Sequence, residues 1–328
     1  MKCCWLHSFP PGSRQGGSFM FEQIPEFAQL GTTVEPVYTP NVRNPVEAMR
    51  IARSIEERNY DLVHVQYGSG CGYVGSKLSH PKLLTLRGSD WYGIQPQSLR
   101  ERAYDLAIRT LTRRSLPAYD AVVSVSERIR REVSEVSDVP VFVIPSGLDL
   151  DRFRPQPRAA ARQQLGHAED TSTWVLFSTA RTGNVVKRYG LAAEAVDRLR
   201  ERVPNARLKI MTGVSREDVP AFVNAADLVL LTSTHEGWPN IIKEAMACNV
   251  PFVSTDVSDL VTVANRAPDC FVVEDSPQAL AEAMYTSLSY PGETETRGMA
   301  RAFDARLMAR NTADLYRDVI ALRNSKTP

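Results

Sequence analysis

Short apolar runs rich in β-branched residues alternate with longer amphipathic segments along the chain. This alternation constrains the fold strongly, because a parallel sheet needs a helical crossover after each strand. In the first half, strands are predicted at Lys2–His7, Thr33–Tyr38, Leu62–Tyr67, Leu83–Arg87, Ala121–Val125 and Val141–Ile144. In the second half, they are predicted at Val175–Thr179, Ala206–Met211, Leu228–Leu231, Phe252–Ser254 and Phe271–Val273. The sequence therefore predicts an α/β protein with two Rossmann-like, doubly wound domains.

A segment without helical or strand periodicity separates the two halves. It runs from Pro145 to Pro155 and is punctuated by proline and glycine. We therefore predict an N-terminal domain over 1–148 and a C-terminal domain over 149–307, with 308–328 returning as a helix to the N-terminal domain. Doubly wound sheets bind ligands outside the carboxyl ends of their strands. We expect the function to lie in a cleft where the two domains face each other.

Composition excludes several classes of protein. Hydrophobic residues make up 43% of the chain and charged residues 23%, which excludes disorder as the main state. The formal charge of +1 gives no global field that favours nucleic acid. No apolar run reaches the roughly 18 residues of a membrane span, and the stretch before Pro10 is too short for a signal peptide. We therefore expect a cytoplasmic protein. Its five cysteines and five histidines are scattered without zinc-ligand spacing, so we expect no metal site.

The most informative stretch follows the predicted strand Leu228–Leu231. It reads Thr-Ser-Thr-His-Glu-Gly-Trp-Pro-Asn-Ile-Ile-Lys-Glu-Ala-Met-Ala-Cys-Asn-Val-Pro over residues 232–251. Glu236 precedes a helix that Pro239 would open, and Glu244 lies one turn inside it. Backbone N–H groups and the positive end of this helix would face the edge of the sheet and attract an anion. A single carboxylate here would be typical of a solvated helix start, but the pair favours a functional loop.

This stretch resembles the donor-site motif of glycosyltransferase family 4, whose members are retaining enzymes of the GT-B fold. The resemblance extends along the chain: Val143–Pro155 resembles the family's linker, Asp120–Ser126 its last N-domain strand and helix cap, and Gly16-Gly17 its first glycine-rich loop. It implies transfer of a sugar from a nucleoside diphosphate sugar to an acceptor hydroxyl, in surface polysaccharide or glycoconjugate synthesis. We expect no cofactor and no metal.

The resemblance also implies roles for individual residues. Glu236 would contact the hydroxyls of the donor sugar and Glu244 the ribose, since a carboxylate accepts two hydroxyl hydrogen bonds. Arg181 and Lys187, in the loop after the predicted strand Val175–Thr179, match the cations that hold the diphosphate. Glu236, Arg181 and Lys187 form the predicted catalytic set. The remaining predicted donor-binding residues are Gly16, Gly17, Gly237, Trp238, Pro239 and Asn240.

Two positions depart from the family's pattern. Arg87-Gly-Ser-Asp90 stands where many relatives have His-Gly-x-Asp, so a permanent cation replaces an imidazole. We treat Arg87 and Asp90 as candidate contacts to a phosphate or to the acceptor. Ser258 stands where relatives often carry glycine. A catalytically silent subunit that binds sugar nucleotides is therefore kept as an alternative. A sugar-nucleotide epimerase of the same fold is a second alternative, which the paired Glu236 and Glu244 disfavour.

Two shorter motifs are weaker. Gly70-Cys-Gly-Tyr-Val-Gly75 spells the dinucleotide fingerprint, with Asp90 about twenty residues later, but it follows the third predicted strand rather than the first. Asp149-Leu-Asp151 spells the Asp-x-Asp that holds a divalent cation in another glycosyltransferase fold, but it falls in the predicted linker. We therefore predict neither a nicotinamide cofactor nor a metal.

The segment Gln97–Arg131 is basic, with eight arginines, no lysine and four acidic residues. A solvated helix face is the commoner explanation of such charge. Family members that elongate lipid-linked glycans dock on anionic membranes through basic N-domain helices. Besides a glycan or lipid-linked acceptor, we therefore retain a second expected partner, the inner face of a membrane. The residues expected to contact it are Arg100, Arg102, Arg109, Arg113 and Arg114.

Overall fold

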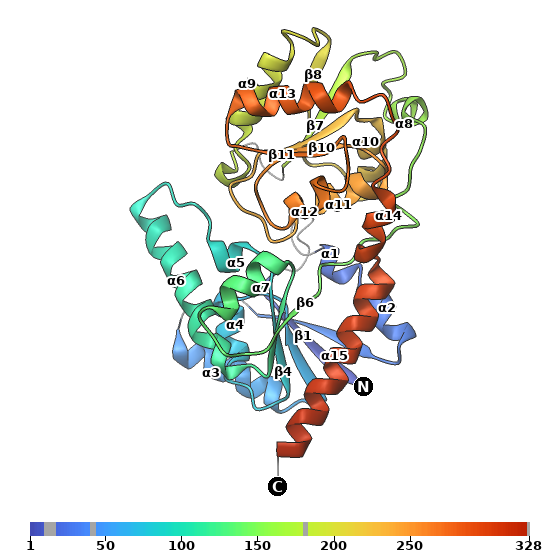
Figure 1. Cartoon of the computed structure of the whole chain (residues 1–328). Coiled ribbons are helices and arrows are strands. Elements are labelled where there is room, and N and C mark those ends of the chain that lie inside the picture. The colour runs from blue at the N-terminus through green and yellow to red at the C-terminus, as the bar shows by residue number, and fades with distance from the viewer. Residues whose placement is uncertain (10–17, 40–43, 180–182, 327–328) are drawn as a thin grey trace. The chain divides into compact units, whose positions relative to one another are not determined.

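The computed structural model in Figure 1 describes residues 1–9, 18–39, 44–179 and 183–326. The chain divides into two compact units. The N-terminal unit comprises Met1–Gly147 with Ala305–Pro328, and the C-terminal unit comprises Leu148–Asp304. Each unit is built on one parallel sheet with helices on both faces, which confirms the predicted fold class. Within the described ranges, no helix combines the length and the apolar character needed to cross a membrane.

The N-terminal unit has six parallel strands in the order β2-β1-β3-β4-β5-β6. They are β1 (Lys2–His7), β2 (Thr33–Tyr38), β3 (Leu62–Val65), β4 (Lys82–Leu86), β5 (Ala121–Ser124) and β6 (Val141–Val143). The central strands β3, β4 and β5 are buried along their whole length. Such continuous burial is expected of a sheet that is covered on both faces.

Some helices of the N-terminal unit begin where a side chain accepts a hydrogen bond from the first turn. Ser98 and Glu101 form a capping box at the start of α6, and the side chain of Ser126 accepts a hydrogen bond from the backbone of Ile129 in α7. In Figure 1, α3, α4 and α6 lie on one side of the sheet and α2 and α15 on the other. The helical elements are α1 (Ser18–Phe21), α2 (Ile24–Gln29), α3 (Pro45–Glu56), α4 (Ser69–Gly75), α5 (Ser89–Tyr92), α6 (Leu99–Ser115), η1 (Leu116–Ala118), α7 (Glu127–Ser134) and α15 (Ala305–Lys326).

The last helix, α15, belongs to the N-terminal unit although it follows the C-terminal unit in sequence (Figure 1). The Tyr316 hydroxyl accepts a hydrogen bond from Trp5 Nε1 at 2.9 Å and bonds to His64 Nδ1 at 2.5 Å. Further along the helix, Arg323 forms an ion pair with Asp120 at 2.8 Å. These contacts confirm the prediction that the C-terminal helix packs on the N-terminal domain.

The C-terminal unit has five parallel strands in the order β11-β10-β9-β7-β8. They are β7 (Thr173–Ser178), β8 (Ala206–Met211), β9 (Leu228–Leu231), β10 (Phe252–Thr255) and β11 (Phe271–Val273). Helices α9 and α13 pack together on one face, where their alanines and leucines meet the sheet, and α10 packs against α8 and α11. The helical elements are α8 (Arg158–Gln164), η2 (Val185–Lys187), α9 (Tyr189–Leu199), α10 (Val219–Ala225), α11 (Asn240–Ala247), α12 (Leu260–Ala264), α13 (Pro277–Leu288), α14 (Arg297–Ala300) and η3 (Arg301–Phe303).

Candidate active site

The carboxyl ends of β7 and β9 lie next to each other, because these two strands pair in the sheet. The loop after β7 ends in η2 and leads into α9, and the loop after β9 leads into α11. The backbone N–H of Thr234 donates to the carbonyl of Val186 at 3.0 Å, and the Thr232 hydroxyl donates to the carbonyl of Lys187 at 2.7 Å. These bonds hold the β7–α9 loop and the β9–α11 loop together.

Glu236 lies at the centre of this edge. Its Oε1 accepts a hydrogen bond from Lys187 Nζ at 2.6 Å and another from the Ser233 hydroxyl at 2.7 Å. The Lys187 and Glu236 side chains are 21% and 19% exposed, so the pair is partly open to solvent. Glu236 Oε2 has no hydrogen bond to any described residue, which leaves it able to accept a hydroxyl.

Two of the three predicted catalytic residues, Lys187 and Glu236, are therefore in contact. The third, Arg181, lies outside the described residues, as do Gly16 and Gly17.

Glu244 lies in the second turn of α11 and is only 3% exposed. Arg216, in the loop after β8, donates from NH1 to Glu244 Oε1 at 2.6 Å. A buried carboxylate needs such a partner, because burying an unpaired charge is costly. Like Glu236, Glu244 has one oxygen held by its own unit and a second, Oε2, without a hydrogen bond to the described residues. The sequence motif did not predict Arg216, which reaches Glu244 only because of the order of the strands.

The predicted donor-binding residues between the two glutamates have different surroundings. The Gly237 carbonyl accepts a hydrogen bond from the Ser258 hydroxyl at 2.5 Å. The Trp238 ring is 9% exposed and its centroid lies 4.3 Å from that of Phe303. Trp238 therefore packs inside the unit and shapes the loop. Pro239 is the N-cap of α11 and Asn240 its first residue, so the helix begins one position later than a first-turn proline would place it.

Arg87 follows β4 in the N-terminal unit. Its guanidinium donates to the Gln66 carbonyl at 2.9 Å, to Gln66 Oε1 at 2.6 Å and to the Ser146 hydroxyl at 2.8 Å. Burial lowers the pKa of Arg87 to about 10, so the side chain is still a cation at neutral pH. These contacts fix the direction of the guanidinium at the carboxyl edge of the first sheet.

Asp90 is fully buried one turn beyond Arg87. Its carboxylate accepts backbone N–H groups of Gly68 at 2.9 Å, Gly88 at 2.9 Å and Arg87 at 3.0 Å. Burial raises the pKa of Asp90, and these three N–H groups oppose the rise. Asp90 therefore organises the turn after β4, and of this predicted pair Arg87 is the better candidate for contact with a ligand.

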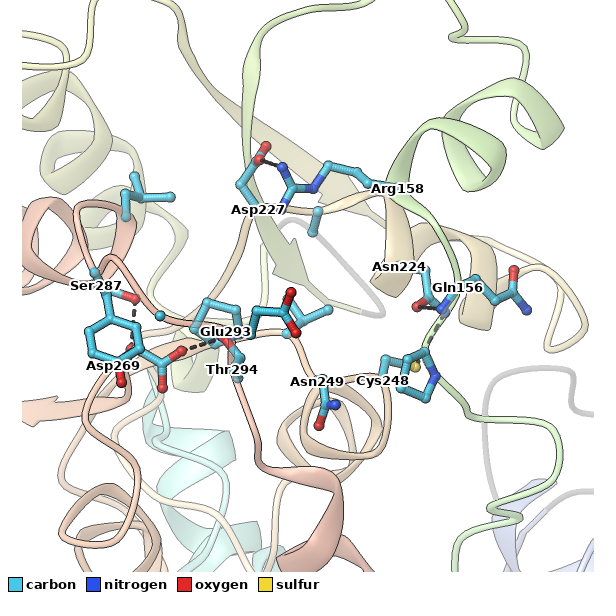
Figure 2. A pocket seen from close by; sticks show the side chains of 17 residues that line it. Gln156, Arg158, Asn224, Asp227, Cys248, Asn249, Asp269, Ser287, Glu293 and Thr294 are labelled. Carbon is cyan, nitrogen blue, oxygen red and sulfur yellow. Dashed lines mark hydrogen bonds and ion pairs between the residues drawn. The ribbon is translucent and has the colours of Figure 1, made fainter.

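A hollow of about 540 Å³ in the C-terminal unit lies elsewhere (Figure 2). Its lining residues Asp227 and Pro251 come immediately before β9 and β10, so the hollow lies at the amino ends of these strands. Arg158 pairs with Asp227 at 2.6 Å, and the Thr294 hydroxyl donates to Asp269, as the dashed lines show. None of the predicted site residues within the described ranges lines it, so the candidate site remains the carboxyl edge of the sheet.

The Asp-x-Asp sequence in the linker forms a turn. Asp149 Oδ1 accepts the backbone N–H groups of Asp151 at 2.9 Å and Arg152 at 3.0 Å, which is the usual role of aspartate at such a position. Over the described ranges, no three His, Cys, Asp or Glu side chains are grouped as metal ligands. Independence from metal stays a prediction to be tested.

Comparison with known proteins connects these two units to one family. Residues 10–152 match the family model described as Glycosyltransferase Family 4, and residues 189–289 match that of Glycosyl transferases group 1. The chain is also 27% identical to TuaC of Bacillus subtilis, a glycosyltransferase assigned to teichuronic acid biosynthesis. This match covers 87% of the chain and 88% of TuaC.

Solved structures share the fold. Sucrose-phosphate synthase from Thermosynechococcus elongatus matches with a TM-score of 0.80 at 18% identity, covering 98% of this chain and 100% of that one. HepE from Anabaena, solved with UDP-glucose, matches with a TM-score of 0.72 at 18% identity, covering 97% and 100%. With the two family matches, these findings show that the chain belongs to the group 1 and family 4 glycosyltransferases, enzymes of the GT-B fold that use nucleotide sugars.

Proposed function

We propose that this enzyme transfers a sugar, with retention of configuration, from a nucleoside diphosphate sugar to a hydroxyl of a growing surface glycan. The proposal rests on one observation, which is that the carboxylates of Glu236 and Glu244 have the same pattern of hydrogen bonding. Both stand on one loop–helix segment, and each has Oε1 held by a cation of the same unit and Oε2 without a partner among the described residues. Two hydroxyl-bearing rings, the donor sugar and the ribose, suit these two acceptors.

Departure of the diphosphate requires positive charge near the leaving group, because negative charge develops there. Lys187 lies beside Glu236 at the carboxyl edge of the sheet, and the backbone N–H groups at the start of α11 face the same edge. We propose that Lys187, together with Arg181, stabilises the charge that develops on the leaving diphosphate. The acceptor hydroxyl would then attack from the face that the diphosphate leaves.

The identity of the substrates is proposed from the relatives. HepE was solved with UDP-glucose and TuaC is assigned to teichuronic acid biosynthesis, so we propose a UDP-sugar and a polysaccharide acceptor as the first pair to test. The N-terminal unit would bind the acceptor. Its fixed guanidinium, Arg87, would suit an acceptor that carries a carboxylate or a phosphate.

Contact with an anionic membrane is proposed through α6. Leu99 and Leu106 are 81% and 61% exposed on this helix. Arg109 pairs with Asp105 at 2.8 Å, and the Arg113 guanidinium lies 4.9 Å from the Trp91 ring centroid, so these two arginines already have partners in the unit. Exposed leucines beside further arginines are typical of a helix that lies on a membrane surface.

Vesicle sedimentation tests the membrane proposal. The remaining arginines of the set, Arg100, Arg102 and Arg114, are exposed. We expect the enzyme to sediment with vesicles that contain anionic lipid and to stay in solution with neutral vesicles. Replacing Leu99 and Leu106 by serine should abolish sedimentation. Equal binding to both kinds of vesicle, or no effect of the serine variant, would refute the contact.

A thermal-shift screen with UDP-, GDP- and ADP-sugars tests the proposed donor. We expect one class to raise the melting temperature of the parent enzyme, and Glu244→Ala to lose most of that shift. Glu201→Ala, which removes an exposed carboxylate between α9 and β8, serves as the matched control and should keep it. No shift with any nucleotide sugar, or an equal shift in Glu244→Ala, would contradict the proposal. Binding without release of nucleoside diphosphate would instead favour the silent-subunit alternative.

A further inference from the structure

Two residues with an unfavourable backbone conformation contact the β9–α11 loop. Arg188 has φ 51° and Ser258 has φ 53°. This left-handed region is unfavourable for a residue with a Cβ atom and open to glycine. Such strain often occurs at functional sites, where the surrounding structure must over-determine it. Glycine would adopt this conformation without strain. The side chains of Arg188 and Ser258 must therefore have a role that glycine could not fill.

Arg188 comes directly after Lys187 and before α9. Its Nε donates to the Thr232 carbonyl at 2.5 Å and its NH2 to the Ser233 carbonyl at 3.1 Å. The same guanidinium forms an ion pair with Asp275, whose Oδ1 lies 2.6 Å from NH2. One planar side chain thus joins the start of the β9–α11 loop to the β7–α9 loop and to the segment before α13.

Ser258 holds the other end of the loop. It follows β10, is 3% exposed, and donates from Oγ to the Gly237 carbonyl at 2.5 Å. Thr255, the last residue of β10, donates from Oγ1 to the Ser233 carbonyl at 2.7 Å. The backbone is therefore fixed just before Glu236, at Ser233, and just after it, at Gly237.

We infer that Arg188 and Ser258 are positioning residues, which hold the Glu236 carboxylate against Lys187 in the geometry that transfer requires. The inference rests on the proposed function and deepens it, since it says how that site is kept in place. Neither residue needs to touch the substrate. A loop that shifts by about an ångström loses mainly turnover, because pre-organisation acts on the transition state more than on binding.

Arg188→Gly and Ser258→Gly test the inference. Glycine adopts φ near 50° without strain, so each variant should keep the fold and lose only the side-chain hydrogen bonds. We expect kcat to fall at least tenfold, KM for the donor to change less than threefold, and the melting temperature to stay within a few degrees of the parent. Asn249→Gly is the matched control: Asn249 has φ 55° in the same unit, at the far end of α11, and kcat should not change.

The variant Arg188→Lys distinguishes the hydrogen bonds of the guanidinium from the effect of its positive charge. Lysine keeps the positive charge but cannot reach two carbonyls and a carboxylate with one planar group. We expect Arg188→Lys to be as slow as Arg188→Gly. Recovery of parent turnover in Arg188→Lys would overturn the positioning role of Arg188.

Hydrogen–deuterium exchange gives a readout that does not depend on activity. Exchange over residues 232–239 should be faster in Arg188→Gly and Ser258→Gly than in the parent, with β8 unchanged. Unchanged exchange in both variants, or faster exchange with parent-like kcat, would overturn the inference. If the parent enzyme binds no nucleotide sugar, the proposed function fails, while the exchange result still decides whether the two residues brace the loop.

Discussion

Glu236 owes its geometry to two hydrogen-bond donors that share one of its oxygens. Lys187 Nζ and Ser233 Oγ lie 2.6 and 2.7 Å from Oε1. A carboxylate held in this way keeps a fixed plane, and charge-assisted bonds of this kind are stronger than neutral ones. The loop therefore presents Oε2 in a defined direction before any hydroxyl arrives.

Glu236→Gln should keep the size of the side chain and lose its charge. We expect kcat/KM for the nucleotide sugar to fall by about 100- to 1000-fold, the usual loss for one preorganised polar group. The fold should persist, because the position is partly open to solvent. Steady-state kinetics against Glu201→Gln as the control measures the loss. A Glu236→Gln enzyme within twofold of the parent would show that the carboxylate does not contact the sugar.

The residues that hold the site were harder to predict than the residues that form it. Glu236, Glu244 and Lys187 belong to recognisable motifs, so the sequence alone indicated them as candidate site residues. Arg216 meets Glu244 across 28 positions of sequence, and no local pattern links the two. Arg188 belongs to no motif, and two of its partners are backbone carbonyls whose positions depend on strand pairing.

Among the elements, α15 is attached to the first sheet by a buried polar chain. Tyr316 bonds to Trp5 and to His64 Nδ1, and His64 Nε2 lies 2.6 Å from Thr85 Oγ1. All of these groups are buried. This series of buried hydrogen bonds therefore fixes the register of α15 on the sheet, because any slip would leave several polar groups unpaired.

Tyr316→Phe should destabilise the N-terminal unit. The variant keeps the ring but leaves Trp5 Nε1 and His64 Nδ1 without their partner. An unsatisfied buried polar group costs about 1–3 kcal/mol, so we expect a loss of at least that size in the free energy of unfolding. Urea unfolding followed by tryptophan fluorescence measures it. Tyr290→Phe, at an exposed tyrosine, is the control and should be neutral. Equal urea midpoints for Tyr316→Phe and the parent would show that these buried hydrogen bonds do not stabilise the unit.

His64 makes the same unit sensitive to acid. Burial, helped by the nearby charge of Arg87, lowers the pKa of His64 from 6.5 to about 3. Between pH 6.5 and about 3, His64 therefore binds a proton in the unfolded protein but not in the folded unit. Stability from neutral His64 is complete above about pH 6.5 and falls as the pH drops towards 3, with a slope that approaches about 1.4 kcal/mol per pH unit.

His64→Gln removes this titration. Between pH 6.5 and 5, the free energy of unfolding of the variant should depend less on pH than that of the parent. Urea unfolding at several pH values compares the two slopes. Parallel slopes would show that His64 is not the group that takes up the proton.

Hydrophobic periodicity predicted most of the strand positions, whereas the role of one glycine motif could not be predicted from the sequence. β1, β2, β8, β9 and β11 have the predicted bounds. β7 starts earlier than predicted, because Thr173 and Trp174 also pair with β8. The glycines of residues 70–75 lie in α4, where a Cβ at Gly75 would come within 2.4 Å of Val65. The dinucleotide-like spacing is thus explained by close packing, which needs glycine for the same steric reason as a phosphate loop.

Considered as a whole molecule, the enzyme is proposed to supply its own cations for the diphosphate, Lys187 and Arg181. The nearest sequence match to a metal motif, Asp149-Leu-Asp151, forms a turn in the linker. We therefore expect turnover to be unchanged in the presence of excess EDTA. If chelation abolished turnover and a divalent ion restored it, Asp149 and Asp151 would have to be reconsidered as ligands.

We propose that cations at the carboxyl edge of the second sheet drive departure of the diphosphate. Release of nucleoside diphosphate by Lys187→Ala is the decisive measurement, made beside the parent at constant ionic strength and fixed acceptor. We expect a fall in kcat of about 100- to 1000-fold with a much smaller change in affinity for the donor, because the charge grows in the transition state. Arg181→Ala should behave alike, and the double variant should lose less than the product of the two, since both act on one group. A Lys187→Ala enzyme with kcat within twofold of the parent would show that Lys187 does not stabilise the leaving diphosphate.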